Sequence, residues 1–263
     1  MKLGNRFFLA LAAAVMLSSG VASAEPVLVR HVEGLVHLFL SLRSPEGGVL
    51  ATGDLIQEAR VDRVTSRLVL HFEDGSLHDE TAVFSQRGHF QLITHHLVQK
   101  GPAFERPLDM MIDCPTGHVT VRYKSEHGEE QVEDEHMDLP PDVANGLIVI
   151  LLKNVQRDEL PASVSLVAAT PKPRLVKVAM SVAGTDSFSI GGSARKATHY
   201  LLKVDIGGVA GLLAPVIGKQ PPDSHVWISE GEAPVFMRSQ APMFMGGPVW
   251  QLDLVSPVWP GGR

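Results

Sequence analysis

Three polar residues interrupt strand faces that are otherwise apolar: the carboxylic acid Asp79, the hydroxyl of Thr94 and the imidazole of His96. Side chains alternate between the two faces of a strand, so Asp79 shares its face with Leu77 and Val83. A buried carboxylate is costly unless it is paired and hydrogen-bonded. On the expected register Asp79 lies opposite Thr94, with His96 diagonally beside it. We therefore expect the three to cluster on a concave face, as polar anchors for a ligand, as a structural ion pair or at a wet rim.

The face on which Asp79 lies follows from the hairpin that precedes it. Asp74-Gly75 fits a two-residue type I′ turn, which would place His71 opposite His78 and Leu70 opposite Asp79. The apolar residues of the hairpin then share one face, and Asp79 lies among them. In the next strand, a bulge would shift every pair by one residue.

The same carboxylate and imidazole give an alternative function, a secreted hydrolase that uses Asp79 and His96. No G-x-S-x-G nucleophile elbow occurs, and no nucleophile stands at a suitable spacing. The only cysteine, Cys114, lies in a turn-like segment and has no partner histidine in its sequence context. We therefore assign no catalytic residue from the sequence.

The chain has twelve histidines, which raises the question of a metal site. His95 and His96 are neighbours on a strand and point to opposite faces. His71 and His78 fit better, since directly opposed Cβ atoms lie about 5 Å apart. Glu80 is the only nearby third ligand, and an exposed histidine pair is the simpler interpretation. We expect no metal and no cofactor.

Apolar residues in three regions are candidates for the wall of a ligand pocket. Leu147 and Leu151 share one face of a predicted helix, and Trp227 belongs to an aromatic and Met-rich C-terminal region. The Gly-rich apolar segment 207–218, which contains Leu212, is poorly suited to a rigid strand interior. For segment 207–218 the interpretations are a mobile apolar lid over a pocket, a loop that touches a membrane, or a short buried helix or loop. For the aromatic region the alternative is a packed core.

Period-two alternation with frequent turn signals predicts a mainly β chain, arranged as a sandwich or barrel. The expected strands lie at 34–43, 49–60, 65–72, 77–84, 89–99, 107–113, 118–124, 130–137, 162–168, 173–181, 186–190, 197–206, 225–229, 234–239 and 248–255. One segment breaks the pattern: apolar residues at helical spacing predict a helix over 141–154, with Pro141 in its first turn. We expect a single β-rich domain over residues 25–263.

Residues 1–24 read as a secretory signal peptide. Lys2 and Arg6 precede an apolar run, and cleavage is expected after Ala24 at a small-residue site. Removal of these residues changes the formal charge from -6 to -8. An exported chain with a single cysteine cannot form an intramolecular disulfide, which favours a bacterial periplasmic or secreted protein.

Charge and hydropathy exclude several classes of protein. The acidic balance argues against nucleic acid as a partner, because phosphate binding needs clustered Lys and Arg. No stretch after the signal peptide reaches the length of a membrane span. The acidic segment 126–138 fits a solvated hairpin.

The order of elements resembles a known architecture. The chain closes with His225-Val226-Trp227-Ile228 followed by Gly231-Glu232-Ala233-Pro234-Val235. This pattern of strand, polar turn, proline and strand resembles uncharacterised bacterial secreted β-proteins. Those are similar in outline to periplasmic lipoprotein-carrier and regulator proteins, and the resemblance implies a curved antiparallel sheet folded around a helix. It brings no catalytic or binding motif with it.

The sequence favours a periplasmic binding or carrier protein for an apolar or amphipathic, lipid-like ligand. We expect a strongly curved antiparallel sheet or half-barrel with one principal helix, because a concave apolar face with a few polar groups is typical of ligand sites. The predicted ligand-binding residues are Asp79, Thr94, His96, Leu147, Leu151, Leu212 and Trp227. The alternatives are the hydrolase described above and an envelope scaffold that contacts another protein through a sheet edge or through segment 126–138.

Overall fold

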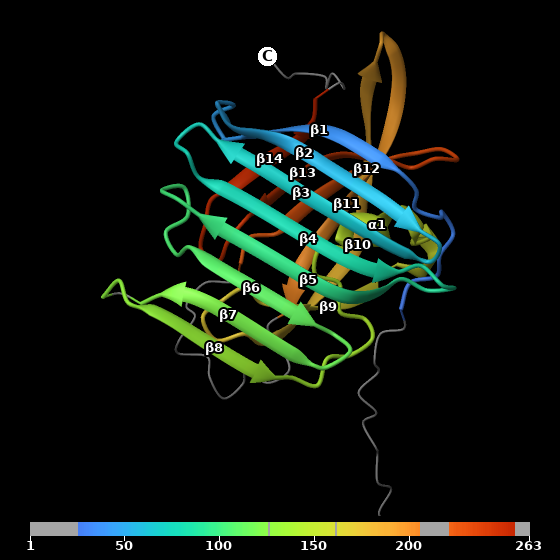
Figure 1. Cartoon of the computed structure of the whole chain (residues 1–263). Helices are drawn as coiled ribbons and strands as arrows, with labels where there is room; N and C mark the ends of the chain where they lie inside the picture. The colour runs from blue at the N-terminus through green and yellow to red at the C-terminus, as the bar shows by residue number, and fades with distance from the viewer. Residues whose placement is uncertain (1–25, 126, 161, 206–220, 256–263) are drawn as a thin grey trace, which may run out of the picture.

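One continuous antiparallel sheet forms most of the molecule (Figure 1). The computed structural model describes residues 26–125, 127–160, 162–205 and 221–255, which hold fourteen strands, helix α1 (Ile148–Asn154) and a short 3-10 helix, η1 (Arg157–Glu159). The strands are β1 (Val36–Arg43), β2 (Val49–Arg60), β3 (Arg63–Phe72), β4 (Leu77–Ser85), β5 (Gln91–Lys100), β6 (Leu108–Asp113), β7 (His118–Lys124), β8 (Glu130–His136), β9 (Ala162–Val167), β10 (Leu175–Ile190), β11 (Ser193–Asp205), β12 (Ser224–Ser229), β13 (Phe236–Pro242) and β14 (Val249–Leu254). The predicted mainly β fold with one principal helix is confirmed.

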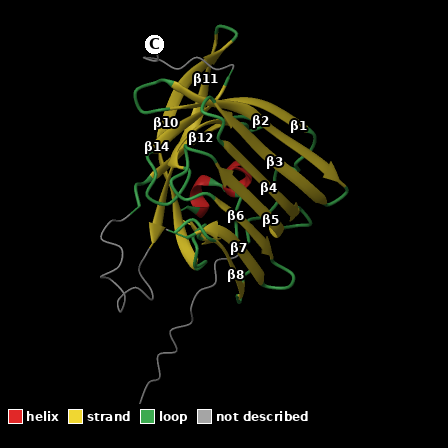
Figure 2. Ribbon diagram, turned by 60° about the vertical axis from the view of Figure 1, so that its left-hand side comes forward, coloured by secondary structure: helices red, strands yellow, loops and turns green. Residues whose placement is uncertain are grey.

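The sheet is built from two meanders that join at their first and last strands. Strands β1 to β8 follow one another outward, and β9 to β14 follow one another back until β14 pairs with β1. The two ends of the sheet, β8 and β9, are not paired with each other. The residues between them carry helix α1 across the concave side of the sheet (Figure 2).

The main core lies between the concave face of the sheet and α1. It takes alternate side chains from both meanders, such as Leu70 and Phe84 from one and Met180 and Ile228 from the other. Leu147, which directly precedes α1, and the apolar residues of α1 fill the space between them. Strand β3, for example, alternates between buried and exposed residues because its concave face is covered by the core.

The helix is shorter than predicted over 141–154. Val143 instead forms a parallel bridge with Ser165 of β9, so the backbone before α1 is extended there. Gly146 follows with a φ of 70°, which breaks any helix before Ile148. Helical spacing of apolar residues was correct only for the last two turns, because pairing with β9 determines the conformation of the first residues.

The side chain of Asn145 binds the backbone of β9 at the edge where no strand is paired with it. Its side-chain Nδ2 donates to the Val167 carbonyl at 2.9 Å, and its Oδ1 accepts from the Val167 N–H at 2.8 Å. The amide thus takes the place of a paired strand and blocks the edge against further pairing. At the other end of the sheet, β8 carries acidic side chains along an exposed strand, which also disfavours edge-to-edge association.

The hairpin between β3 and β4 has a different register from the one predicted. His71 pairs with Leu77, and Leu70 pairs with His78. The loop has three residues, 73–75, with Gly75 at a φ of 84°, and the Phe72 N–H donates to the Ser76 carbonyl at 3.0 Å. This is a three-residue hairpin loop that ends in a left-handed glycine, whereas the prediction assumed a two-residue turn.

The consequence is a change of face for all of β4. Because side chains alternate along a strand, a shift by one residue moves each side chain of β4 to the other face relative to β3. Glu80 therefore shares the concave face with Leu68, and Asp79 shares the convex face with Val69.

A smaller correction concerns β10. The segments 173–181 and 186–190, predicted as two strands, form one strand of sixteen residues. Its register with β11 shifts between Val182 and Gly184, so the interruption in the pattern is a bulge.

Candidate functional site

The three predicted polar anchors lie on the convex face of the sheet. Asp79 accepts hydrogen bonds from Arg67 at 2.9 and 2.6 Å, and His96 Nε2 lies 2.9 Å from Asp109 Oδ1. Hydrogen bonding to the Arg67 guanidinium lowers the pKa of Asp79 below its ordinary value. Thr94 pairs with Val83 rather than with Asp79. The predicted concave cluster of these residues is wrong, and the pair required by the hydrolase hypothesis does not form, because Asp79 and His96 bind different partners.

A carboxylate–imidazole cluster does occupy the concave face, one residue away in each strand. The His95 Nε2–H donates to Glu80 Oε1 at 2.8 Å, and His78 Nε2 lies 3.8 Å from Glu80 Oε2. Gln99 Nε2 donates to His78 Nδ1 at 3.1 Å and to the Met243 carbonyl at 2.8 Å. The predicted residues Asp79 and His96 are not part of this cluster, because the register places their neighbours Glu80 and His95 on the concave face instead.

The cluster is closed off by the segment that leads into α1. A Cβ atom at Gly146 would lie 2.8 Å from the Ala82 Cβ and 3.2 Å from His95 Cδ2, so only glycine allows this approach. His95 is 1% exposed and His78 is 4% exposed. A solvent-borne substrate therefore has no access to these imidazoles.

Replacement of Glu80 by Gln is expected to weaken the acid sensitivity of the fold. Burial by itself raises the pKa of Glu80, but the hydrogen bonds and charges of His78 and His95 outweigh it and hold the pKa far below 4.5. Below about pH 4.5 the unfolded chain therefore binds a proton that the folded chain does not, and stability is lost as the pH falls. The difference in unfolding free energy between wild type and E80Q should shrink from pH 6 to pH 3 in urea titrations. A difference that stays constant over this range would contradict the assignment.

A pocket of about 470 Å³ lies at the C-terminal end of α1, between η1 and the strands β10 to β12. Its wall consists of His31, Leu152, Lys153, Val155, Arg157, Thr185, Lys196, Thr198, Tyr200, Ile228, Ser229, Glu230, Gly231 and Pro234. A cavity beside the helix is therefore present, as the ligand-binding hypothesis requires.

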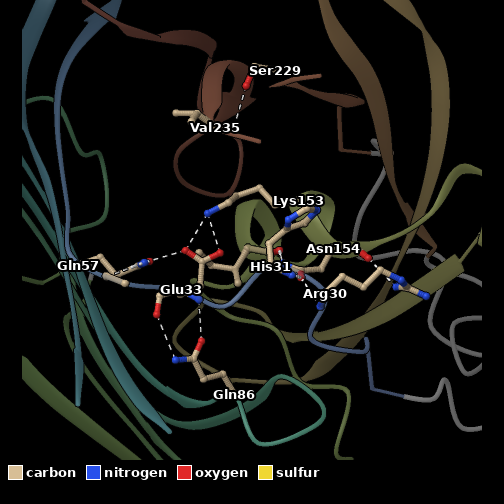
Figure 3. A network of polar contacts seen from close by, with 11 residues as sticks. Arg30, His31, Glu33, Gln57, Gln86, Lys153, Asn154, Ser229 and Val235 are labelled. Atoms are coloured by element: carbon tan, nitrogen blue, oxygen red, sulfur yellow. Dashed lines mark hydrogen bonds and ion pairs between the residues drawn. The ribbon is translucent and has the colours of Figure 1, made fainter. Parts of the chain in front are cut away.

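An N-terminal strap, which we define as residues 27–35, contributes one residue to the wall of this pocket. It is fixed to the loop before β5, where the Val29 N–H donates to the Gly88 carbonyl at 2.9 Å and the Phe90 N–H donates to the Val27 carbonyl at 2.9 Å. The strap then crosses the C-terminal end of α1 (Figure 3). It brings His31 into the wall of the pocket.

Glu33 of the strap is the centre of a buried polar network (Figure 3). Its carboxylate lies 2.6 Å from Lys153 Nζ and accepts from Gln57 Nε2 at 2.7 Å. Its backbone N–H and carbonyl bind the Gln86 side chain at 2.8 and 3.1 Å. The network joins the strap, two strands and α1, and it neutralises a carboxylate that is only 3% exposed.

Asn154 fixes the strap to the last turn of α1. Its Oδ1 accepts from the backbone N–H groups of Arg30 and His31 at 2.8 and 2.7 Å, and its Nδ2 donates to the Ile150 carbonyl at 2.8 Å. Arg30 Nη1 donates to the Asn154 carbonyl at 2.6 Å. A guanidinium is favourable at this position because helix C-termini carry unpaired carbonyls and partial negative charge.

Opposite the strap, polar groups converge at the pocket mouth. Arg157 Nη2 donates to Thr198 Oγ1 at 2.7 Å, to Thr185 Oγ1 at 3.2 Å and to Glu230 Oε1 at 2.5 Å. Lys196 also lines the pocket, and no carboxylate among the described residues lies within ion-pair distance of it. The rim therefore combines two cations and one carboxylate.

The predicted apolar residues lie elsewhere. Leu147 and Leu151 are buried in the main core, and the helix presents Leu152 and Val155 to the pocket instead. Trp227 lies on the opposite face of β12 from Ile228, where it stacks on His199 at 4.2 Å and donates to Asp186 Oδ2 at 2.6 Å. Leu212 and segment 207–218 lie outside the described residues.

Sequence reasoning missed the charged residues of the pocket. Lys153, Arg157, Lys196 and Glu230 come from four separate elements or loops, and their spacing follows no motif. The one available signal was a basic residue, Lys153, in the last turn of a predicted helix. Among the described residues, no group of three or more His, Cys, Asp and Glu side chains has a geometry that could hold a metal ion.

Comparison with protein-family models and with curated protein sequences found no match. Among solved structures, the chain is similar to the crystal structure of a β-barrel-like protein of the domain of unknown function DUF1849 from Brucella abortus. The two share 10% sequence identity with a TM-score of 0.43, over 87% of this chain and 99% of the other. In the described part of this chain, no helix is both long and apolar enough to cross a membrane.

Proposed function

We propose that this protein binds or carries a small amphipathic ligand in the bacterial periplasm, and that the pocket beside α1 is the ligand site. The pocket itself carries the proposal: its volume of about 470 Å³ lies within the usual range for small-molecule sites, about 300–1,000 Å³. The periplasmic location rests on the signal peptide expected at residues 1–24.

The wall of the pocket supports an amphipathic ligand over a wholly apolar one. Leu152, Val155 and Ile228 provide an apolar surface between the helix and the sheet. More than half of the other lining residues carry polar side chains, which a purely apolar ligand would desolvate without replacing their hydrogen bonds. A ligand with one apolar part and one polar part matches both surfaces.

Binding can be tested with the neutral fluorescent probe N-phenyl-1-naphthylamine. We expect saturable binding to the chain without residues 1–24, and mass spectrometry of an organic extract should detect a co-purified amphipathic molecule. Thr185→Trp, at an exposed position on the pocket wall, should reduce probe affinity at least tenfold by filling the mouth. Thr65→Trp is the matched control, because Thr65 is an exposed strand residue outside the pocket.

Two results would contradict the proposal. One is the absence of saturable probe binding, and the other is equal binding by T185W and T65W. An envelope scaffold acting through the acidic strand β8 would give the first result, because such a protein needs no ligand in the pocket.

A further inference from the structure

The donors around Glu230 suggest what the polar end of the ligand is. Resting on the proposed function, we propose that it is an anion, a carboxylate or phosphate group, bound by Arg157 and Lys196 at the pocket mouth. The Glu230 carboxylate occupies the position that we assign to that anion.

Three donors converge on a single oxygen of Glu230. Arg157 Nη2 lies 2.5 Å from Glu230 Oε1, Thr198 Oγ1 donates to it at 3.1 Å, and Thr185 Oγ1 donates to it at 3.4 Å. Thr198 is only 5% exposed, so its hydroxyl is fixed within the wall. A guanidinium and two hydroxyls directed at one oxygen form a site that any carboxylate or phosphate oxygen can occupy.

Glu230 can be exchanged for a ligand anion because its pair with Arg157 is exposed. Their side chains are 36% and 55% exposed, and exposed ion pairs contribute little to stability. The described contacts of Arg157 all use Nη2, so its Nε and Nη1 donors remain for a second oxygen of a bidentate anion.

Lys196 supplies a second charge, and no carboxylate of the described residues is within ion-pair distance to neutralise it. The Glu230 N–H donates to the Lys196 carbonyl at 2.9 Å, which holds the two residues side by side at the rim. Lys153, the other lysine of the wall, is already paired with the buried Glu33. An incoming anion would therefore balance the charge of Lys196 and contact the same donors as Glu230 does. The adjacent Leu152, Val155 and Ile228 would contact the apolar part of the same ligand.

Ligands with the same dodecyl group but different head-group charges test the inference. We compare how well two anions, dodecanoate and dodecyl phosphate, and one cation, dodecyltrimethylammonium, displace N-phenyl-1-naphthylamine. The affinity of each compound is also measured by isothermal titration calorimetry. We expect the two anions to bind at least tenfold more tightly than the cation, and their affinity to fall as NaCl is raised. The affinity for inorganic phosphate is measured as well, to separate a free anion from an anionic head group. If it binds as tightly as dodecyl phosphate, the anion site is supported and free phosphate is its source.

Variants separate the roles of the rim residues. Lys196→Met should weaken dodecanoate binding about fivefold. Lys203 is an exposed lysine of the same strand that lies outside the pocket, so Lys203→Met should not change dodecanoate binding. Glu230→Gln should strengthen dodecanoate binding, because it removes the competing charge and leaves Arg157 available. Circular dichroism confirms that each variant is folded.

Failure of this inference differs from failure of the proposed function. If the probe binds but anion and cation displace it equally, or if E230Q weakens dodecanoate binding, the anion inference is overturned and the binding function stands. If neither the probe nor any dodecyl compound binds, both are overturned.

Discussion

Lys153→Met will lower the free energy of unfolding by about 3–5 kcal/mol, because it leaves the carboxylate of Glu33 buried without a counter-ion. Lys153 Nζ contacts both oxygens of that carboxylate, at 2.6 and 2.7 Å. Gln57 can still donate to it, but an amide does not neutralise the charge. The loss is measured by urea denaturation at pH 7, with the denaturant slope compared between variant and wild type.

Two further variants show that the loss comes from burial of the charge. Arg87→Ala breaks an exposed ion pair with Asp62, in which the arginine is 82% exposed, and should cost at most about 1 kcal/mol. Glu33→Met combined with Lys153→Met removes both charges and should recover part of the stability lost in the single variant. Equal losses in K153M and R87A would contradict the role given to the pair.

Asn154→Leu will release the N-terminal strap, with a loss of about 2–4 kcal/mol. The substitution leaves the backbone N–H groups of Arg30 and His31 without their acceptor, and each unsatisfied donor that stays buried costs about 1–3 kcal/mol. Hydrogen–deuterium exchange should become faster across residues 27–33 than in the rest of the molecule. Because His31 lines the pocket, probe affinity should fall together with protection of the strap.

Arg30→Met is the comparison for the strap. It removes the guanidinium contacts with Glu159 and with the Asn154 carbonyl but leaves the Asn154 amide bound to the strap backbone. Exchange across 27–33 should therefore be slower in R30M than in N154L. If the two variants exchange equally fast, the amide of Asn154 is not what fixes the strap.

The positions of most strands could be predicted from the sequence. In β3 and β4, for example, turn residues mark both ends and apolar residues alternate between them, so the observed bounds differ from the predicted 65–72 and 77–84 by two residues or fewer. Alternation of apolar and polar residues indicates that a strand is buried on one face. A sheet that curves around a helix has strands of this kind, because its concave face is covered. The exceptions, such as the start of α1, are segments whose conformation depends on a partner distant in the sequence.

The face of the predicted polar cluster could not be derived from the sequence. A carboxylate next to an imidazole does lie on the concave face, but it is Glu80 with His95 rather than Asp79 with His96. Asp74-Gly75 is compatible with both a two-residue and a three-residue loop, and these differ by one residue in register. No alternation pattern could decide between them, because both faces of β4 contain polar and apolar residues.

By itself, the sequence determined the strand-rich class and the single principal helix. These follow from local spacing, since the alternation of side chains and the residues of each turn act over a few positions. Only the tertiary structure decided the face of Asp79, the start of α1 and the pocket. The pocket joins His31, Lys153, Lys196 and Glu230, which lie far apart in the chain, and their proximity depends on how the two meanders close around the helix.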